Sequence, residues 1–201
     1  MARLQLNKSS LAREGRNLRT YERFLPSLDL KRQQLMAERA KAARTLAGTD
    51  REIESLRRQV GNRLPMLANL NVDLSDLARV TAVVVGSENL VGTQLPVLER
   101  VEVAIGAYTP MTKPHWVDDT AALLQSMLEL RIRRQVEAQR LLLLEAAVKT
   151  ITQRVNLFDK VLIPKTRANI KKIKIYLSDE DMAAVVRSKI AKNKHATARS
   201  V

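Results

Sequence analysis

The chain has 201 residues, of which 45% are hydrophobic but only 3% aromatic. A thick globular core usually recruits aromatic side chains for their large buried area, so this composition favours the apolar seams of packed helices. The sequence contains no cysteine, which excludes disulfide bonds, thiolate nucleophiles and zinc sites built on cysteine. No run of residues approaches the roughly 18 to 20 apolar positions of a membrane-spanning helix.

The formal net charge is +14, and the basic residues gather toward the two ends of the sequence. Residues 1–64 carry 15 lysines and arginines against 7 acidic residues, and residues 118–178 carry 12 against 6. Residues 65–117 carry 3 against 5. Two basic segments flanking an acidic middle favour association with an acidic partner, whether nucleic acid, anionic lipid or an acidic protein.

Apolar residues recur every seven positions through the first basic segment. One register contains Leu4, Leu11, Leu18, Leu25, Leu46, Ile53, Val60 and Leu67, and the register three residues later contains Leu28, Leu35, Ala42, Leu56 and Leu70. This a/d pattern predicts a coiled-coil helix over about residues 8–64. Arg32 and Arg39 occupy a positions, so we expect a looser seam there. Pro26 is expected to kink or restart the helix.

The second basic segment has the strongest periodicity, with apolar residues at alternating spacings of three and four. They are Leu141, Leu144, Val148, Ile151, Val155, Phe158 and Leu162. The pattern predicts a helix over about residues 118–177, with Asp118 and Asp119 favouring its N-terminus. Beyond Pro164 the apolar positions are shifted by about one residue. Because proline lacks an N–H and crowds the preceding turn, we expect a kink there that re-aims the stripe.

The residues between the two helical segments are rich in valine and glycine. Residues 80–85 and 101–105 are expected to form short strands of a hairpin or small sheet, with Gly86 and Gly92 as turn glycines. Gly86 and Gly92 do not form a phosphate-binding loop, because no Lys-Ser/Thr pair follows them. His115 and His195 have no acids and nucleophiles beside them. We therefore expect no catalytic, cofactor-binding or metal-binding residues.

A helix over residues 8–64 would be roughly 85 Å long, too long to be enclosed in a domain of this size. The two helical segments can bury their seams only by folding back on each other. The predicted fold class is mainly α, a long antiparallel two-helix coiled coil with a small β-hairpin-containing segment at the mid-chain tip. The expected divisions are an N-terminal arm (1–70), the tip segment (71–117), a C-terminal arm (118–178) and a mobile basic tail (179–201).

Three segments in the right order resemble the D subunit of V-type and A-type ATPases, which forms their central rotor stalk. TQRVNLFDKVLIPKTRANIKKI (152–173) is similar to the family's C-terminal helix, KRQQLMAE (31–38) to the Lys-Arg-x-x-Leu-x-x-Glu of its first helix, and NLVGTQLP (89–96) to its Asn-x-x-Gly-x-x-x-Pro segment. In the first of these the matching residues are Thr152, Arg154, Val155, Asn156, Val161, Ile163 and Pro164. The resemblance spans about residues 8–177. Pro26 departs from it, and the tail is only weakly similar.

The resemblance implies a non-catalytic axle without a cofactor. Its two terminal helices would enter the ring of nucleotide-binding A and B subunits, which hydrolyse or synthesise ATP. Its other end, together with the small F subunit, would couple through a socket-like stalk subunit to the membrane rotor ring that moves protons or sodium ions. The expected location is therefore the cytoplasm, peripheral to the membrane.

We expect two kinds of functional residue. The helix–helix seam comprises Leu28, Leu35, Leu46, Ile53, Leu56, Leu144, Val148, Ile151, Val155, Phe158 and Leu162. Arg154, Asn156 and Pro164 are candidates for contact with the stator or for the kink. Two other interpretations stay open on the sequence alone: a coiled-coil scaffold unrelated to ATPases, and a basic nucleic-acid-binding rod. The few aromatic residues are too scattered for the stacking platforms that single-stranded nucleic acids favour.

Overall fold

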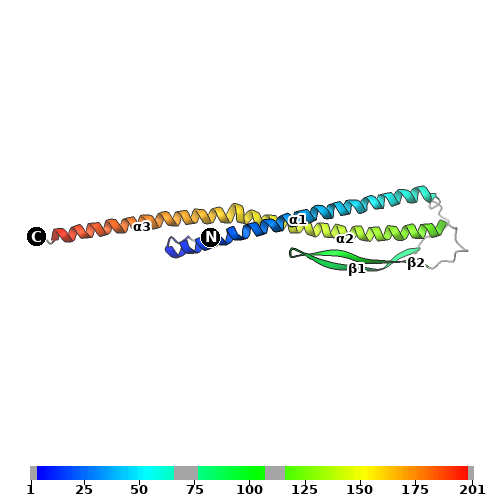
Figure 1. Cartoon of the computed structure of the whole chain (residues 1–201), viewed down its shortest axis with the longest axis horizontal. Coiled ribbons are helices and arrows are strands. Elements are labelled where there is room, and N and C mark those ends of the chain that lie inside the picture. Colours follow the sequence, from blue (N-terminus) through cyan, green and yellow to red (C-terminus); the bar gives the residue numbers. More distant parts are fainter. Residues whose placement is uncertain (1–3, 66–76, 107–115, 199–201) are drawn as a thin grey trace. The chain divides into compact units, whose positions relative to one another are not determined.

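The computed structural model describes residues 4–65, 77–106 and 116–198. Its elements are α1 (Lys8–Arg63), β1 (Ala78–Leu90), β2 (Thr93–Ile105), α2 (Trp116–Leu157), a five-residue π-helical turn η2 (Phe158–Leu162) and α3 (Ile163–Ala198) (Figure 1). The mainly α fold with a hairpin between the long helices, predicted from the sequence, is confirmed. The expected boundary at residue 70 lies outside the described residues.

The chain divides into two units, and each is described by itself. Unit 1 contains Met1–Leu30 and Ile151–Val201, and unit 2 contains Lys31–Thr150. Both α1 and α2 contribute residues to both units. In the described part of the chain, no helix is apolar over a long enough stretch to cross a membrane.

Local capping fixes the start of α1. The side-chain Oδ1 of Asn7 accepts a hydrogen bond from the backbone N–H of Ser10 at 2.7 Å, which satisfies one of the donors left free in the first helical turn. Leu6 and Leu11 flank this cap at the positions of a hydrophobic staple, and both are half-buried. The helix then runs without a break through Pro26, so it does not restart there.

In unit 2, α1 pairs with α2 through a polar layer inside the apolar seam. Thr49 is buried, and its hydroxyl donates a hydrogen bond of 2.7 Å to Oε2 of Glu137. Next to it, at the exposed margin of the seam, Nε of Arg134 donates to the carboxylate of Asp50. Glu137 and Arg134 continue the spacing of three and four upstream of Leu141. A polar residue at a seam position fixes helix register at some cost in stability, because a shifted register would bury it without its partner.

The hairpin of unit 2 is longer than predicted. Its strands have 13 residues each, and they are joined by Val91 and Gly92, which both have positive φ (53° and 87°). Such a two-residue turn matches the right-handed twist of the strands. Gly92 is therefore a turn glycine as expected, but Gly86 lies inside β1. A Cβ atom at Gly86 would come within 2.0 Å of Oε1 of Glu99, so glycine leaves the space that this cross-strand side chain occupies.

The hairpin is anchored at both of its ends. At its base, a buried cluster contains Leu64, Leu77, Trp116, Val117 and Ala121. Near its turn, Leu95 is fully buried, and the Arg140 guanidinium of α2 donates to Oε2 of Glu88 at 2.8 Å and to the carbonyl of Pro96 at 3.4 Å. The hairpin therefore lies along α2 and is not confined to the end of the helices (Figure 1).

In unit 1, the first part of α1 packs against the segment from the end of α2 into α3. The rings of Tyr21 and Phe158 meet edge to face, with centroids 5.4 Å apart. Arg167 of α3 donates to Glu22 at 2.7 Å, but both side chains are largely exposed, so this pair adds about 1 kcal/mol at most. The apolar face is buried at Ile151, Val155, Ile163 and Ile173.

The π turn η2 accounts for the shift of one residue in the apolar pattern. The backbone N–H of Ile163 bonds to the carbonyl of Phe158, five residues earlier, so this turn contains one residue more than an α-helical turn. A continuous spacing of three and four would place residue 165 in the seam after Leu162, yet Lys165 is exposed and Thr166 is buried. The extra residue turns the apolar stripe of α3 back toward the seam. This is the change of direction that had been expected from a kink at Pro164.

Two side chains show how the π turn is accommodated. Pro164 follows it directly and is exposed, and its ring would clash with the carbonyl of residue 160 in a regular α-helix. Widening the turn relieves that clash. The buried hydroxyl of Thr166 donates to the carbonyl of Leu162 at 2.7 Å, so its burial leaves no donor unpaired.

The last helix extends further than the sequence predicted. A tail was expected from residue 179, whereas α3 continues to Ala198. Leu177 is half-buried, and all described side chains from residue 178 to residue 194 are exposed. The seam thus ends near Leu177, while the backbone stays helical because this segment contains no proline or glycine.

The π turn gives a testable prediction about deletions. Removing Lys160, an exposed residue of the turn, together with Pro164→Ala should allow a continuous α-helix that keeps every later seam residue in place. The free energy of unfolding should therefore change by less than about 1 kcal/mol, as measured by thermal and denaturant unfolding followed by circular dichroism.

The matched control removes Lys149, an exposed residue of α2, in the same Pro164→Ala background. This deletion turns Ile151, Val155 and Phe158 about 100° away from the seam and should lower the melting temperature by about 10 °C or more. Equal destabilisation by the two deletions would show that the π turn does not correct the phase of the seam.

Candidate functional site

The residues predicted for the seam all lie on the covered side of their helices. Leu35, Leu144, Ile151 and Val155 are buried, and Leu144 is fully buried. The remaining members are half-buried: Leu28, Leu46, Ile53, Leu56, Val148, Phe158 and Leu162. Among them the structure gives a direct ring contact for Phe158, with Tyr21 of α1.

Sequence reasoning missed three members of the seam, although the register contained the signal. Tyr21 and Thr49 occupy d positions of the heptads that hold Leu28, Leu35 and Leu56. Glu137 lies four residues before Leu141 in the second helix. A search for aliphatic residues alone passes over such positions, because an aromatic ring and a hydrogen-bonded polar pair can also fill a seam.

The candidates for partner contact lie on the outside. Arg154, Asn156 and Pro164 are all exposed, within three turns of one another around η2. Among the described residues no acidic side chain lies within ion-pair distance of Arg154. Its guanidinium is therefore available to a partner, whereas the neighbouring Val155 is committed to the seam.

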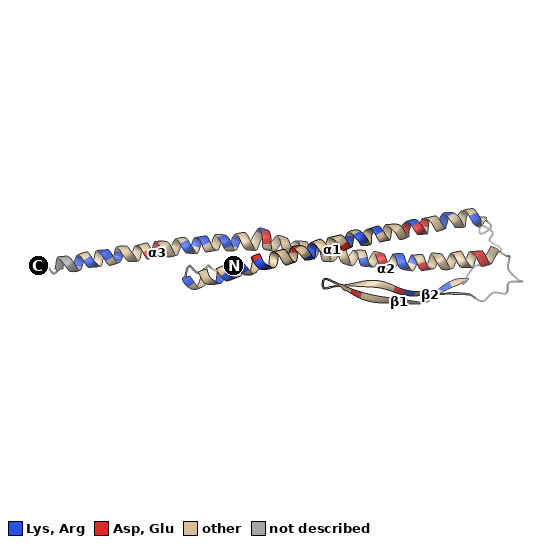
Figure 2. Cartoon of the chain, in the orientation of Figure 1, with Lys and Arg blue, Asp and Glu red and all other residues tan. Residues whose placement is uncertain are grey.

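Positive charge is dense on α3. Residues 165–174 contain Lys165, Arg167, Lys171, Lys172 and Lys174, all of them exposed, and no acidic residue (Figure 2). The apolar residues of the same segment that face inward are Ile170 and Ile173. One short stretch of helix thus combines a covered apolar side with a basic outer side, which suits attraction to an acidic surface.

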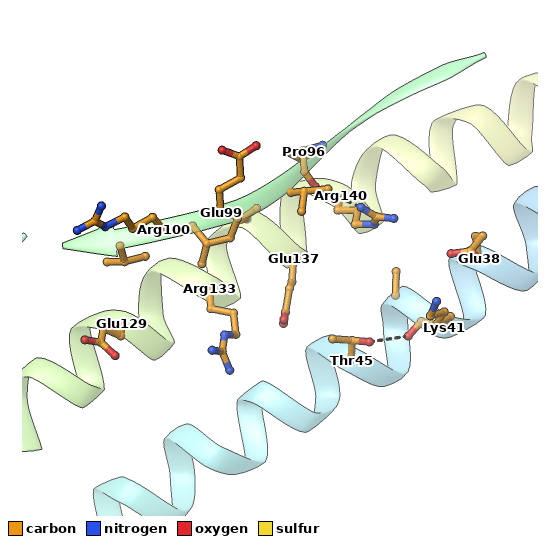
Figure 3. A pocket seen from close by; sticks show the side chains of 15 residues that line it. Glu38, Lys41, Thr45, Pro96, Glu99, Arg100, Glu129, Arg133, Glu137 and Arg140 are labelled. Atoms are coloured by element: carbon orange, nitrogen blue, oxygen red, sulfur yellow. Dashed lines mark hydrogen bonds between the residues drawn. The ribbon is translucent and has the colours of Figure 1, made fainter. Parts of the chain in front are cut away.

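Unit 2 contains a groove of about 510 Å³ between α1, α2 and β2 (Figure 3). Its walls carry acidic and basic side chains together: Glu38 and Lys41 on α1, Glu99 and Arg100 on β2, and Glu129, Arg133, Glu137 and Arg140 on α2. Glu137 is engaged by Thr49 and Arg140 by Glu88, so part of this charge holds the fold together. In the described residues, no three metal-ligating side chains gather closely enough to hold an ion.

Comparison with known proteins places these features in a family. The family model described as the D subunit of ATP synthase matches residues 10–193. That match includes both sides of the seam, the hairpin, the π turn and the basic part of α3.

Individual relatives agree along nearly their whole length. The chain is 33% identical over 193 residues to the V-type ATP synthase D subunit of Borreliella burgdorferi, with 96% of this chain and 95% of the relative covered. The protein of the same name from Chlamydia trachomatis serovar L2 is 33% identical over 199 residues, covering 96% of each chain. The one from Chlamydia felis is 30% identical over 195 residues, covering 96% of this chain and 94% of its own. A paired helical seam, a mid-chain hairpin and this full-length match agree with the resemblance seen in the sequence, and the chain belongs to the family of ATP synthase D subunits.

Proposed function

We propose that the chain is the non-catalytic central shaft of a V/A-type ATPase, coupling ATP hydrolysis or synthesis in a ring of A and B subunits to proton or sodium-ion transport. The observation that carries this proposal is the pairing of an internal apolar seam with an exposed basic surface in a member of this family. Family membership supplies the complex, and the arrangement of side chains suggests how this chain would act in it.

The seam suits the transmission of force between two ends of a shaft. Leu144 in unit 2 and Ile173 in unit 1 are each fully buried. Helices that slide past one another would expose apolar surface, at a free-energy cost of about 25 cal/mol per Å². In unit 2 the Thr49–Glu137 hydrogen bond adds a specific partner to this non-directional attraction. A shaft held in this way turns as one piece within each unit.

The outer surface suits contacts that form and break repeatedly. Exposed ion pairs contribute about 0 to 1 kcal/mol each, so the basic residues of α3 could attract acidic loops of a surrounding ring without holding any one position tightly. Arg154, Asn156 and Pro164 would contact the stator, and the π turn beside Pro164 would direct the faces presented to the three catalytic sites.

The remaining partners follow from the same proposal. The F subunit would bind the stalk, and a socket-like protein would connect it to the membrane rotor ring. The chain would then be cytoplasmic and peripheral to the membrane, and it would need no cofactor of its own. The N-terminal arm, the tip segment and the C-terminal arm would be its working divisions.

Reconstitution tests the proposed function as a whole. An A/B ring with its membrane sector, assembled with and without the full chain, should hydrolyse ATP in both cases but move ions only when the chain is present. Ion transport of equal rate in its absence would rule out the shaft. Copurification with nucleic acid that weakens steeply with salt, in place of an A/B ring, would favour the nucleic-acid-binding rod instead.

Two substitutions near η2 should separate stability from function. Phe158→Ala removes a half-buried ring and its contact with Tyr21 and should cost about 2 to 4 kcal/mol of unfolding free energy. Arg154→Ala removes an exposed charge and should cost less than about 1 kcal/mol. In the reconstituted complex, however, Arg154→Ala should lower ATP-driven ion transport by about two- to five-fold, the effect of losing up to about 1 kcal/mol of ion-pair free energy.

The matched control for Arg154 is Lys149→Ala, another exposed cation of α2 that is not among the residues matching the family pattern. It should leave transport unchanged. Transport that is normal in Arg154→Ala, with normal assembly, would show that this arginine belongs to a solvated face.

A further inference from the structure

The outer edge of the hairpin is open. The sheet has two strands in the described part of the chain, so β1 pairs with β2 along one edge only. The hairpin residues that line the groove against α1 and α2 all come from β2, over residues 96–101. The groove thus runs along β2, and α2 reaches β1 through the Arg140–Glu88 ion pair near the turn. In the described residues, the edge of β1 opposite β2 presents backbone N–H and carbonyl groups without a strand beside them.

The centre of this edge lacks the charges and prolines that usually prevent strands from pairing. Residues 80–86, VTAVVVG, contain no charge and no proline and are dominated by valine. Val83, Val84 and Val85 are 39%, 45% and 47% exposed. Natural edge strands are commonly blunted by lysine or proline, and an uncharged β-branched run of this length readily accepts another strand. One bulge lies at residue 81 of β1. A second register shift, between Val84 and Val85, has its extra residue in β2, at Glu99, so residues 82–87 of β1 themselves contain no inserted residue.

We propose that β1 docks antiparallel on β1 of a second copy of the chain, so that two hairpins form a four-stranded sheet. The charged residues of β1 favour a second copy as the partner. They lie near the two ends of the strand, with Arg79 near its start and Glu88 near its end. Antiparallel pairing with Val84 beside Val84 of the other copy, with residue 81 as the extra residue of the bulge, places Arg79 beside Glu88 at both ends. Parallel pairing in register would place like charges together.

Glu88 can bind Arg140 of its own chain and Arg79 of the second copy at the same time. Arg140 of the same chain binds its Oε2 atom at 2.8 Å, and the Glu88 side chain remains 53% exposed. Oε1 therefore remains for Arg79 of the second copy, and Arg79 is exposed. The pairing depends on the hairpin of the free chain and not on the proposed function, so either can fail without the other.

The edge is short, so self-association should be weak. One pair of strands buries less than the roughly 1,200 Å² of a stable interface, which suggests a dissociation constant on the order of 10 to 100 μM. Sedimentation equilibrium of the full chain should show a mass that rises with concentration from 22.6 kDa toward twice that value. A mass of 22.6 kDa up to about 1 mM, ten times the weaker estimate, would overturn the proposal.

Val84→Lys places a charge at the centre of the edge and should keep the chain monomeric throughout that range. Leu142→Lys is the matched control, since Leu142 lies on α2 and is 60% exposed, and it should leave the dimer intact. Both variants should retain the helical circular dichroism of the parent. A dimer that survives Val84→Lys would overturn the proposal, because the copies would then meet through another surface such as the exposed end of α3.

Charge exchange tests the direction of pairing. Arg79→Glu alone places two acidic residues together at both ends and should weaken the dimer at least about ten-fold. The double variant Glu88→Arg with Arg140→Glu places two basic residues together at both ends and should weaken the dimer to the same degree. It keeps the ion pair between residues 88 and 140 of the same chain, with the charges exchanged. Mixing these two variants restores opposite charges at both ends and should restore a heterodimer of parental affinity. Variants that dimerise no better when mixed would overturn the antiparallel arrangement.

Discussion

The phase of the apolar seam is the constraint on which the rest of the structure depends. A helix of 56 residues such as α1 is too long to be enclosed by the core of a small domain, so its stability depends on a partner helix that keeps its apolar side facing inward. An α-helix drifts by about 20° per heptad from a repeat of 3.5 residues, and one misplaced residue turns the stripe by about 100°. In unit 1 the π turn at Phe158–Leu162 supplies one extra residue, after which Thr166 and Ile173 are buried again.

Periodicity in the sequence was enough to predict the helices but not how their phase is maintained. Helix α1 spans Lys8–Arg63, close to the 8–64 predicted from the heptads, and the seam residues from Leu28 to Leu162 are buried or half-buried. The shift of one residue beyond Pro164 was visible in the sequence. A π turn is one physical response to a proline, and whether it forms depends on whether α1 offers apolar surface on the side to which the turn returns the stripe, which is a tertiary property.

The hairpin and α3 show the same limit in two other ways. The strands were expected to be short because Gly86 was taken for a turn residue, yet its role depends on the side chain of Glu99 on the opposite strand. The end of α3 was expected at Leu177 because the seam ends there, but a helix without proline or glycine has no local reason to stop. Sequence periodicity reports where a helix is covered. It does not report how far the backbone remains helical beyond its cover.

Polar contacts and apolar burial have different roles in this fold. Apolar area supplies most of the attraction between helices, but it is tolerant of sliding, since one aliphatic residue replaces another at little cost. The Thr49–Glu137 hydrogen bond and the Arg140 contacts to the hairpin are directional, so each is satisfied in one arrangement only. In the proposed shaft this division matters, because helices that can slide past one another do not keep a fixed rotational angle relative to each other. A few directional contacts inside the seam would fix the rotational angle between the helices. Exposed cations such as Arg154 would meanwhile be able to exchange partners on the outside.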